Sequence, residues 1–401
     1  MIILPDRNIP RARFLLPVYR REWMPSSQAM FKDQFGNPGV QTRFRVRARL
    51  DDGHVVWRGF FDDRDDFDAF LWAIATGSLR YERELWRLPT PQWYPDLGEQ
   101  LSYDFATVTF LTTTGSNQTY TSPSDWNNSS NTVECIGGGA SGGVGRNNSS
   151  IAASGGGGGS YSEISNFSFA TPGTTTATYN VGAQGGSVST TSGTSFGVSG
   201  SVTYWNDTAD PGGGATNAKC SAKGGLFGRG ATTGTAASGA GGNTGTSWGQ
   251  TRFGGGNSGT AATAGPSSSG GGGAGGPNGA GAGSSNATNT ATSGGNGDNG
   301  SGGSGGAGKT GGGTATNGGN GTEFDASHGS GGGGGGATAT TNTTTTAGDG
   351  GSYGGGGGGA CVVINGSTPT VTSGNGGQGI IVVSYTPSGY FSQPNLAMIG
   401  M

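Results

Sequence analysis

Glycine is concentrated in one stretch of this 401-residue chain, and that stretch limits what the chain can fold into. Of the 90 glycines, 39 lie within residues 271–360, whereas residues 1–100 contain 6. Apart from alanine, the hydrophobic side chains of residues 271–360 are only Phe324 and Tyr353. Two such side chains cannot offset an ordering cost of roughly 1–2 kcal/mol per residue by burial. A conventional core is therefore excluded there, which argues against a metabolic enzyme with a packed pocket.

Glycine-rich sequence of this kind has two alternative structures. By default it is a flexible linker. If it is ordered, its backbone N–H and C=O groups must bond to neighbouring segments, as extended helices with about three residues per turn allow. Gly294, Gly297, Gly300, Gly303 and Gly306 have that triplet spacing, and a second phase runs through 302, 305, 308 and 311. Because no proline lies between them, collagen is excluded, and we expect a sandwich of packed polyglycine-II-like helices.

The first 100 residues have an ordinary composition and predict a small α+β domain. They contain 15 Lys and Arg and 14 Asp and Glu. Residues 42–50 alternate between apolar and arginine or threonine residues, with the period of a half-buried strand. Asp52-Gly53 is a turn signal, so residues 54–61 are expected to pair back as a second strand. A helix is then expected between residues 65 and 77.

Arginines of this domain suggest either nucleic-acid binding or docking to a protein. The candidates for docking are Arg11, Arg13, Arg43, Arg45 and Arg47. Five aspartates follow between residues 62 and 68, and the whole chain has a net charge of −3, so nucleic acid is not expected as a partner. We expect the arginine face to pair with the aspartates or with a neighbouring subunit. The leading arm is expected either to dock or to remain solvated.

From residue 101 onward, short strands alternate with turn-forming residues. The expected strands cover 106–113, 132–136, 177–181, 199–205, 361–364 and 380–385. Their spacing favours an antiparallel β-domain over parallel βαβ units. The expected organisation is an α+β attachment domain (1–100), a β-framework (101–210), a glycine-rich insertion (211–360), closing strands (361–386) and a tail (387–401). The fold class is thus mainly β, with an extensive polyglycine-like region.

Motifs for catalysis, cofactors or metals are weak in this sequence. Residues 303–310 match the phosphate-binding loop pattern, but no apolar strand precedes them and the glycines that follow are a poor helix start. Segments around Asp298 and Glu323 match a calcium-binding repeat only in part, with the wrong spacing. The only histidines are His54 and His328, so a zinc site or a His-based triad lacks ligands. We expect no catalytic residues, no cofactor and no metal.

The three cysteines do not form a paired motif. Cys135, Cys220 and Cys361 lie far apart in the sequence, and the first and last adjoin apolar residues in strand-like runs. They are therefore expected to be buried free thiols.

Aromatic residues are scarce beyond residue 200, so their positions are informative. The candidates for receptor binding are Tyr204, Trp205, Phe227, Trp248 and Phe253. Isolated aromatic side chains among Gly, Asn and Ser can stack on sugar rings or insert into a partner surface. The alternative is that these residues, with Phe324 and Tyr353, fill packing gaps at the ends of the glycine sandwich.

Four short segments, taken in order, resemble a known family. They are residues 131–139 (NTVECIGGG), 155–164 (GGGGGSYSEI), 171–183 (TPGTTTATYNVGA) and 376–385 (GGQGIIVVSY). This series resembles the glycine-rich domain of bacteriophage tail proteins over residues 102–385. The resemblance implies a β-framework with glycine-rich excursions in virion fibres and spikes that often bind host surfaces. The composition is also similar to phage tail-tip adhesins, whose polyglycine helices present variable recognition loops.

The expected function is therefore that of a bacteriophage virion fibre or spike protein. It would bind a host-surface glycan or protein without enzymatic activity, dock on other virion proteins through residues 1–100, and form a homotrimer. No run of residues is long and apolar enough to span a membrane, and no signal peptide is expected. Assembly is thus expected in the host cytoplasm, with the mature protein in the virion.

Three other classes remain open at this point. The first is a capsid decoration protein or head fibre without a dedicated receptor, which an image of the particle would distinguish. The second is a glycan-cleaving spike, which lacks a convincing pair of acids beside the aromatic residues. The third is an ice- or mineral-binding protein with flat polyglycine faces, which leaves the charged first 100 residues without a role.

Overall fold

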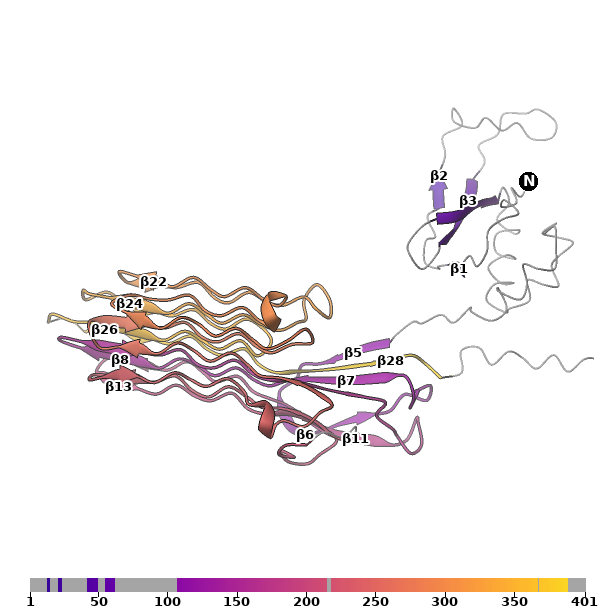
Figure 1. Cartoon of the computed structure of the whole chain (residues 1–401), viewed down its shortest axis with the longest axis horizontal. Helices are drawn as coiled ribbons and strands as arrows, with labels where there is room; N and C mark the ends of the chain where they lie inside the picture. The colour runs from indigo at the N-terminus through magenta and orange to yellow at the C-terminus, as the bar shows by residue number, and fades with distance from the viewer. Residues whose placement is uncertain are drawn as a thin grey trace, which may run out of the picture. The chain divides into compact units, whose positions relative to one another are not determined.

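This computed structural model describes residues 107–214, 218–366 and 368–388, and the backbone of four strands nearer the N-terminus. Contacts between residues divide the chain into two compact units (Figure 1). The first consists of Met1–Asp104 and Gly389–Met401, and the second of Phe105–Ser388. Within its described residues the protein is mainly β, as expected, and its short 3₁₀ turns are η3 (Thr244–Thr246) and η4 (Asp298–Gly300).

The first unit contains a small antiparallel sheet around one long strand. Its strands are β1 (Arg13–Phe14), β2 (Arg21–Trp23), β3 (Thr42–Arg49) and β4 (Val55–Phe61). Strand β3 pairs antiparallel with each of the other three, which confirms the expected hairpin on either side of Asp52-Gly53. The expected helix lies outside the described residues. So do the side chains of Arg11, Arg13, Arg43, Arg45 and Arg47, and their docking role stays a prediction.

One end of the second unit is built from two antiparallel sheets, which we call the sheet end (Figure 1). The first sheet has the order β18 (Thr251–Phe253), β10 (Tyr161–Ser165), β7 (Asn131–Ile136), β28 (Ile380–Tyr385) and β5 (Thr107–Leu111). The second has the order β15 (Cys220–Ala222), β14 (Thr203–Trp205), β11 (Thr176–Val181) and β6 (Gly115–Thr121). Strand β28 lies between β7 and β5, so the last strand closes the sheet that the first strand of this unit begins.

The hydrophobic core lies between these two sheets. Val133, Ile164 and Ile381 from the first sheet pack with Val181 and Trp205 from the second. Connecting segments add Trp126, Phe167 and Phe169, whose rings meet edge-on at centroid distances of 5.0–5.2 Å. All three cysteines are buried free thiols, as expected. Aromatic and β-branched residues thus supply at this end the burial that the glycine-rich part lacks.

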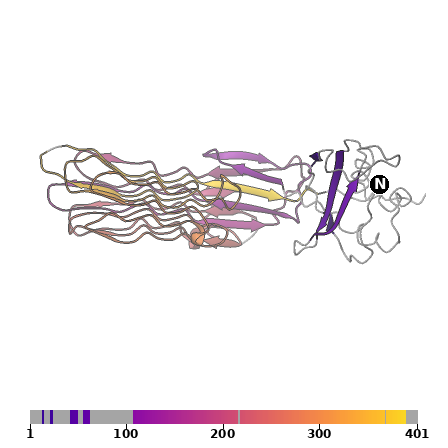
Figure 2. The ribbon, with the colours of Figure 1, turned by 90° about the horizontal axis from the view of Figure 1, so that it is seen from above.

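From the sheet end, glycine-rich runs extend side by side along the unit (Figure 2). Their backbones bond to one another with a three-residue period. In the run 153–160, Gly156 and Gly159 donate to one antiparallel neighbour, at Gly357 and Gly354, with N···O distances of 2.8 and 2.7 Å. The residues that follow each of them donate to a second neighbour, the run that contains Leu226. Gly158, between these residues, donates to a third neighbour at Gly256, so three successive N–H groups point to three different runs, whereas the N–H groups of a pleated strand point to only two sides.

The predicted triplet of glycines from 294 to 306 is present, but it is not one straight run. The chain reverses within it at Asp298–Gly300, where Asp298, Asn299 and Gly300 have positive φ. Gly294 then bonds to Gly306, and Gly297 to Gly303, across the reversal. After the reversal the same phase continues along a single run, in which Gly303, Gly306 and Lys309 donate in turn to residues 330, 333 and 336. In the second phase, Gly302 and Gly305 instead donate back across the reversal, to Gly297 and to the side chain of Asn296. The spacing reflects pairing between runs as well as the repeat within one run.

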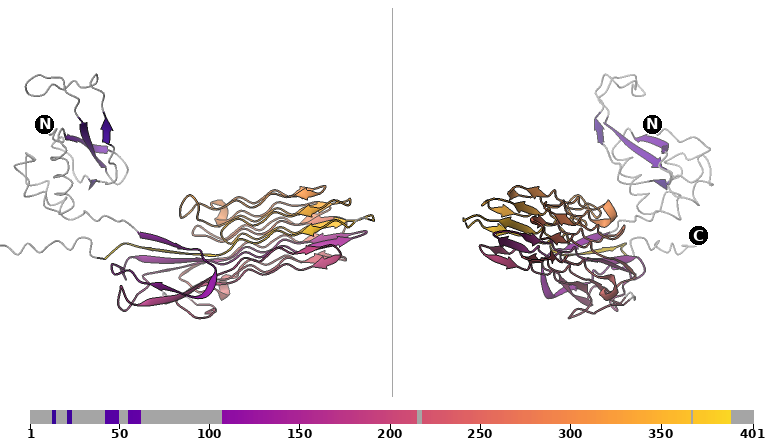
Figure 3. Two further views of the ribbon diagram at one scale, coloured as in Figure 1. Left: turned by 180° about the vertical axis from the view of Figure 1, so that it is seen from behind. Right: turned by 60° about the vertical axis from the view of Figure 1, so that its left-hand side comes forward.

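The opposite end of the runs carries clusters of short strands, which we call the turn end (Figures 1 and 3). One sheet has the order β13 (Gly193–Ser195), β8 (Val144–Asn147), β26 (Ala360–Val363), β24 (Ala337–Ala339) and β22 (Lys309–Thr310). Another has the order β12 (Ser189–Thr190), β27 (Val371–Thr372), β25 (Thr345–Thr346) and β23 (Gly313–Thr314). A three-stranded sheet has the order β16 (Gly230–Ala231), β9 (Ile151–Ala153) and β20 (Pro266–Ser268). A second three-stranded sheet has the order β17 (Thr235–Ala236), β19 (Ala261–Ala262) and β21 (Ala287–Thr288).

Two expectations need correction here. The β-structure is not purely antiparallel, because β8, β26, β24 and β22 run parallel, each reached from the sheet end by its own glycine-rich run. The segments 101–210, 211–360 and 361–386 are also not separate parts. The run 153–160 bonds directly to residues 256 and 357, so the framework and the expected insertion share one hydrogen-bonded lattice. Residues 387–401 are described only as far as Ser388.

Candidate binding surfaces

Two of the five predicted receptor-binding aromatics are core residues, and this prediction is wrong for them. Trp205 has no exposed surface and Tyr204 has 4%. Trp205 packs among Phe167, Phe169 and Tyr179 between the two sheets of the sheet end. Both residues lie in β14, which is an inner strand of its sheet. The polar residues next to them in the sequence suggested an exposed segment, but other strands cover these two side chains.

Trp248 and Phe253 are half-buried and fill gaps at the sheet end, which agrees with the alternative interpretation. The indole ring of Trp248 covers Gly214, where an added Cβ would meet the ring. Phe253 in β18 stacks on Tyr161, with the ring centroids 6.1 Å apart. These side chains therefore pack against the protein rather than extend away from it.

A second aromatic stack includes His328. The imidazole lies between Phe110 of β5 and Tyr353, with ring centroids 4.0 and 5.7 Å away. Its Nδ1 is 2.8 Å from the carboxylate of Asp325, and Phe324 packs against the same cluster. The stack holds the turn at residues 323–330 against the edge of the first sheet, so Phe324 and Tyr353 also serve packing.

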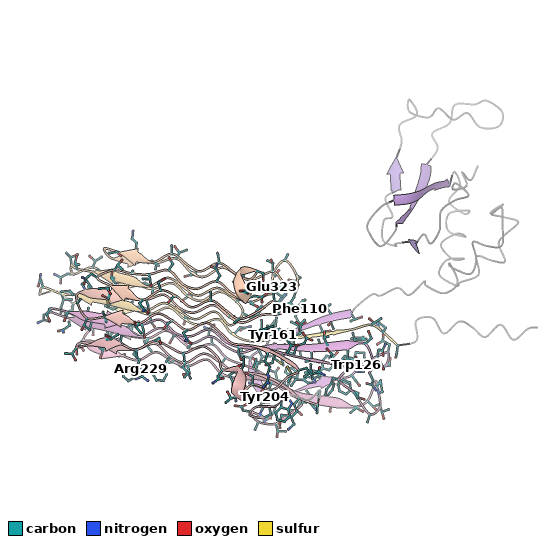
Figure 4. All side chains as sticks on the ribbon, in the orientation of Figure 1. Phe110, Trp126, Tyr161, Tyr204, Arg229 and Glu323 are labelled. Carbon is teal, nitrogen blue, oxygen red and sulfur yellow. The ribbon has the colours of Figure 1, made fainter. Side chains whose placement is uncertain are left out.

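Phe227 alone among the five candidates belongs to an exposed cluster, which we call the flank platform. Its members are Phe196, Val198, Leu226, Phe227 and Arg229. Phe196 is 56% exposed, Val198 48% and Leu226 54%, and they make up three of the four large hydrophobic side chains that are exposed in the described residues. Arg229 lies on the glycine-rich part of the unit, away from Trp126 and Tyr204 (Figure 4).

Pairing of two glycine-rich runs creates this platform. Gly197 donates to Gly228 at 2.9 Å, and Gly200 donates to Gly225 at 3.0 Å, so the two runs are antiparallel neighbours. The rings of Phe196 and Phe227 stack 5.9 Å apart at 17°. Phe196 was not among the predicted binding residues, because the residues that face it lie about 30 positions later in the chain. The sequence does indicate this site in one way: Phe196 and Val198 are two apolar residues on either side of Gly197 within a stretch of Ser, Thr and Gly.

The guanidinium of Arg229 completes the platform. Its Cζ lies 5.7 Å from the ring centroid of Phe196 and 5.5 Å from that of Phe227, within the range of a cation–π contact. The backbone N–H of Arg229 bonds to Ser154 Oγ at 2.8 Å, which fixes the residue to the neighbouring run. Among the described residues, no carboxylate lies within ion-pair distance of Arg229, whereas Lys219 and Lys223 pair with Asp207 and Asp210.

The turn end presents a different surface, rich in hydroxyl and amide groups. Thr340, Thr341, Asn342, Thr343 and Thr344 form an exposed turn between β24 and β25. The other turns at this end include residues 148–150, 191–192, 232–234, 263–265, 289–290, 311–312 and 364–366. None of these residues is charged. Such turns can recognise a ligand by hydrogen bonds, and Lys309 in β22 adds an exposed positive charge at this end.

The weak chemical motifs take no catalytic geometry in the described part of the chain. Lys309 and Thr310 form strand β22, and a turn into β23 follows them, so no helix N-terminus faces the phosphate-loop-like segment. Asp298 is fully buried, and its carboxylate accepts from the backbone and side chain of Asn278 at 2.7 Å. No group of three or more His, Cys, Asp or Glu residues among the described positions could hold a metal ion.

One pair of acidic residues shares a single tyrosine hydroxyl in the first sheet. Tyr161 Oη lies 2.6 Å from Glu134 Oε1 and 3.0 Å from Glu163 Oε2. Burial raises the pKa of Glu134 to about 7; the bond from Tyr161 opposes this shift and the charge of Glu163 adds to it. Burial, together with the charge of Glu134, also raises the pKa of Tyr161 well above its usual range. Glu134 therefore exchanges its proton near neutral pH.

Neither a protein-family model nor a curated protein matches this chain. Among the described residues, no helix has the length and apolar character needed to cross a membrane.

Proposed function

We propose that this chain is a non-enzymatic bacteriophage virion fibre or spike protein that binds the host surface through residues 105–388. The observation that carries the proposal is the lattice of bonded glycine-rich runs, which joins an aromatic core at one end to uncharged, exposed turns at the other. A scaffold whose backbones bond to one another leaves its turns free to vary. It therefore suits the display of a recognition surface.

We further propose that the runs are polyglycine-II-like helices. The three-residue period of donors in the run 153–160 supports this assignment, because such helices have about three residues per turn and no internal hydrogen bonds. Glycine is needed where runs touch. A Cβ added to Gly157 or Gly225 would overlap a carbonyl oxygen of the next run.

Adhesion would be reversible and multivalent. Hydrogen bonds from one turn end are individually weak, and several copies on one particle convert weak contacts into avidity. In this proposal residues 1–100 dock the protein on other virion proteins, the chain forms a homotrimer, and the partner at the turn end is a host glycan or protein.

Chemical shielding of single positions tests the proposal. The native thiols are buried, so an added surface cysteine can be coupled selectively to polyethylene glycol. Asn342→Cys places the polymer at the turn end, and Ser116→Cys places it at an exposed site on the sheet end. We expect the purified chain to bind host cells and block phage adsorption, and we expect the polymer at 342 but not at 116 to abolish this competition.

Absence of binding by the unmodified chain, or loss of competition only with the polymer at 116, would contradict the proposal. Imaging of labelled protein on the particle provides a second readout. A position on the capsid lattice instead of the tail would favour a capsid decoration protein. Deletion of residues 211–360 is a poorer test, because it removes bonding partners of the run 153–160.

A further inference from the structure

We infer that the flank platform is a binding site for an acidic saccharide, beside the turn-end strands β13 and β16 but distinct from the exposed turns of that end. The platform places two aromatic rings, two aliphatic side chains and a cation on adjacent runs of the scaffold. Exposed apolar groups of this size are uncommon on a surface made of Gly, Ser and Thr. Three of the four in the described residues lie on these two adjacent runs.

The rings fit the apolar faces of a sugar. Phe196 is more than half exposed and stacks nearly parallel to Phe227, so the pair offers a broad aromatic surface rather than a single isolated ring. The C–H face of a pyranose packs on such a surface, while its hydroxyl groups point outward to water or to polar neighbours. Thr194, an exposed residue beside Gly230, is one polar neighbour.

The cation selects an acidic sugar over a neutral one. Arg229 lies at similar distances from both ring centroids, so its charge is centred beside the aromatic surface. The surrounding runs, residues 138–162, 182–206 and 222–297, contain no Asp or Glu that could neutralise it. A guanidinium with free donors binds carboxylate or phosphate groups in a forked geometry, which a neutral sugar cannot provide.

The backbone of the site is held in place before the ligand arrives. Gly197 bonds to Gly228 and so joins the two runs. On the neighbouring run, the backbone N–H of Ser154 donates to the carbonyl of Arg229, and the hydroxyl of Ser154 accepts from the N–H of Arg229. The ligand therefore needs to order only side chains, which limits the entropic cost of binding. The acid on the sugar is either a carboxylate or a phosphate, since the guanidinium accepts both.

Calorimetry with the full chain and soluble saccharides tests this inference independently of host adsorption. The probes are oligogalacturonate, the same oligosaccharide with its carboxylates methyl-esterified, and a mannose 6-phosphate oligosaccharide. The variants are Arg229→Gln and Phe196→Leu. Lys219→Gln is the matched control, because Lys219 is a partly exposed lysine at the sheet end of the same unit. Thermal unfolding of each variant shows that the fold is kept.

We expect at least one of the two acidic probes to bind, and the esterified probe to bind at least about tenfold more weakly. Both platform variants should weaken binding about tenfold, and Lys219→Gln should not. Binding to galacturonate alone assigns a carboxylate ligand, and binding to the phosphate probe alone assigns a phosphosugar.

Four results would overturn the inference. They are no binding of either acidic probe, equal binding of the esterified probe, equal losses in Lys219→Gln and Arg229→Gln, and self-association of the chain that Phe196→Leu abolishes. The last result would make the platform an interface between copies. Because adsorption through the turn end needs neither Arg229 nor Phe196, failure of this inference leaves the proposed function standing.

Discussion

At the scale of single residues, glycine has a steric role in the runs. Gly157 lies where its missing Cβ leaves room for the carbonyl oxygen of Ala240 in the next run. The same holds for many buried glycines of the lattice, whose neighbouring backbones come too close for any side chain. Close approach lets each N–H reach a carbonyl on another run, which satisfies backbone groups that would otherwise be buried without a partner.

We predict that Gly157→Ala lowers the free energy of unfolding by about 2–3 kcal/mol or more, because the new methyl group overlaps the backbone at Ala240. Gly186→Ala is the matched control. Nothing lies within 4 Å of a Cβ built at Gly186, so its effect should stay below about 1 kcal/mol. Denaturant unfolding of both variants measures the difference. Equal effects would mean that close approach of the runs does not require glycine.

The shared hydroxyl of Tyr161 predicts a dependence of stability on pH. The pKa of Glu134 is raised by burial from about 4.5 in the unfolded chain to about 7 in the folded protein. The folded state therefore binds this proton more tightly, and the stabilisation is complete below pH 4.5 and lost as pH rises through 7. Unfolding free energy should fall by roughly 2–3 kcal/mol between pH 5 and pH 8.

The variant Glu134→Gln tests the source of this pH dependence. It keeps a side chain that can bond to Tyr161 but cannot titrate, so its stability should change less between pH 5 and pH 8 than that of the parent chain. Asp207 does not interfere in this range. Its bond to Lys219 lowers its pKa, so its contribution is lost only in stronger acid. An unchanged pH profile in the variant would assign the effect to another group.

At the scale of elements, the repeat of the runs sets which changes in length are tolerated. In the run 153–160, Gly156 and Gly159 donate to one neighbour, and Gly157 and Ser160 to another. A run can therefore shift by one full period and still aim each N–H at a carbonyl. A shift of one residue turns every later donor toward a different neighbour.

We predict that insertion of one glycine between Gly157 and Gly158 destabilises the protein more than insertion of three. The single insertion rotates Gly158, Gly159 and Ser160 away from their acceptors, whereas three residues restore the original directions and only displace the end of the run. Thermal unfolding of the two variants decides the order. A higher melting temperature for the single insertion would show that the period is not three.

At the scale of the whole molecule, residues 105–388 form their own compact unit. The backbone bonds outside its strands join residues within that unit, from Ser122 to Ser388. Strand β28, near the end of the unit, pairs with β5, near its beginning, so the lattice between them is closed by one sheet.

This closure predicts that the fragment 105–388 folds without the remainder of the chain. Its melting temperature should match the corresponding transition of the full-length protein within a few degrees. A fragment that ends at residue 375 is the control, because it lacks β28 and leaves β5 and β7 without their shared partner. If the two fragments were equally stable, closure by β28 would not hold the unit together.

The sequence predicted several strands correctly, missed others such as β10 and most short strands of the turn end, and predicted the exposure of aromatic residues poorly. Residues 132–136 and 380–385 carry β-branched side chains between turn residues, and both segments are strands in the structure. Trp205 was expected at a surface and is fully buried, whereas the exposed Phe196 was passed over. Local composition indicates whether a segment extends. It does not indicate which face of the segment another part of the chain covers.

The sequence by itself determined that this protein is mainly β, that its cysteines are buried and that its glycine-rich part has no conventional core, because these properties depend on composition and short-range pattern. Only the tertiary structure decided which runs are neighbours. That choice buries Trp205, places Phe196 against Phe227 and Arg229, and turns the chain back within the glycine triplets at Asp298–Gly300. The physical reason is that glycine-rich runs bond through identical backbones, so the order of the runs is fixed by the sheets and turns at their ends.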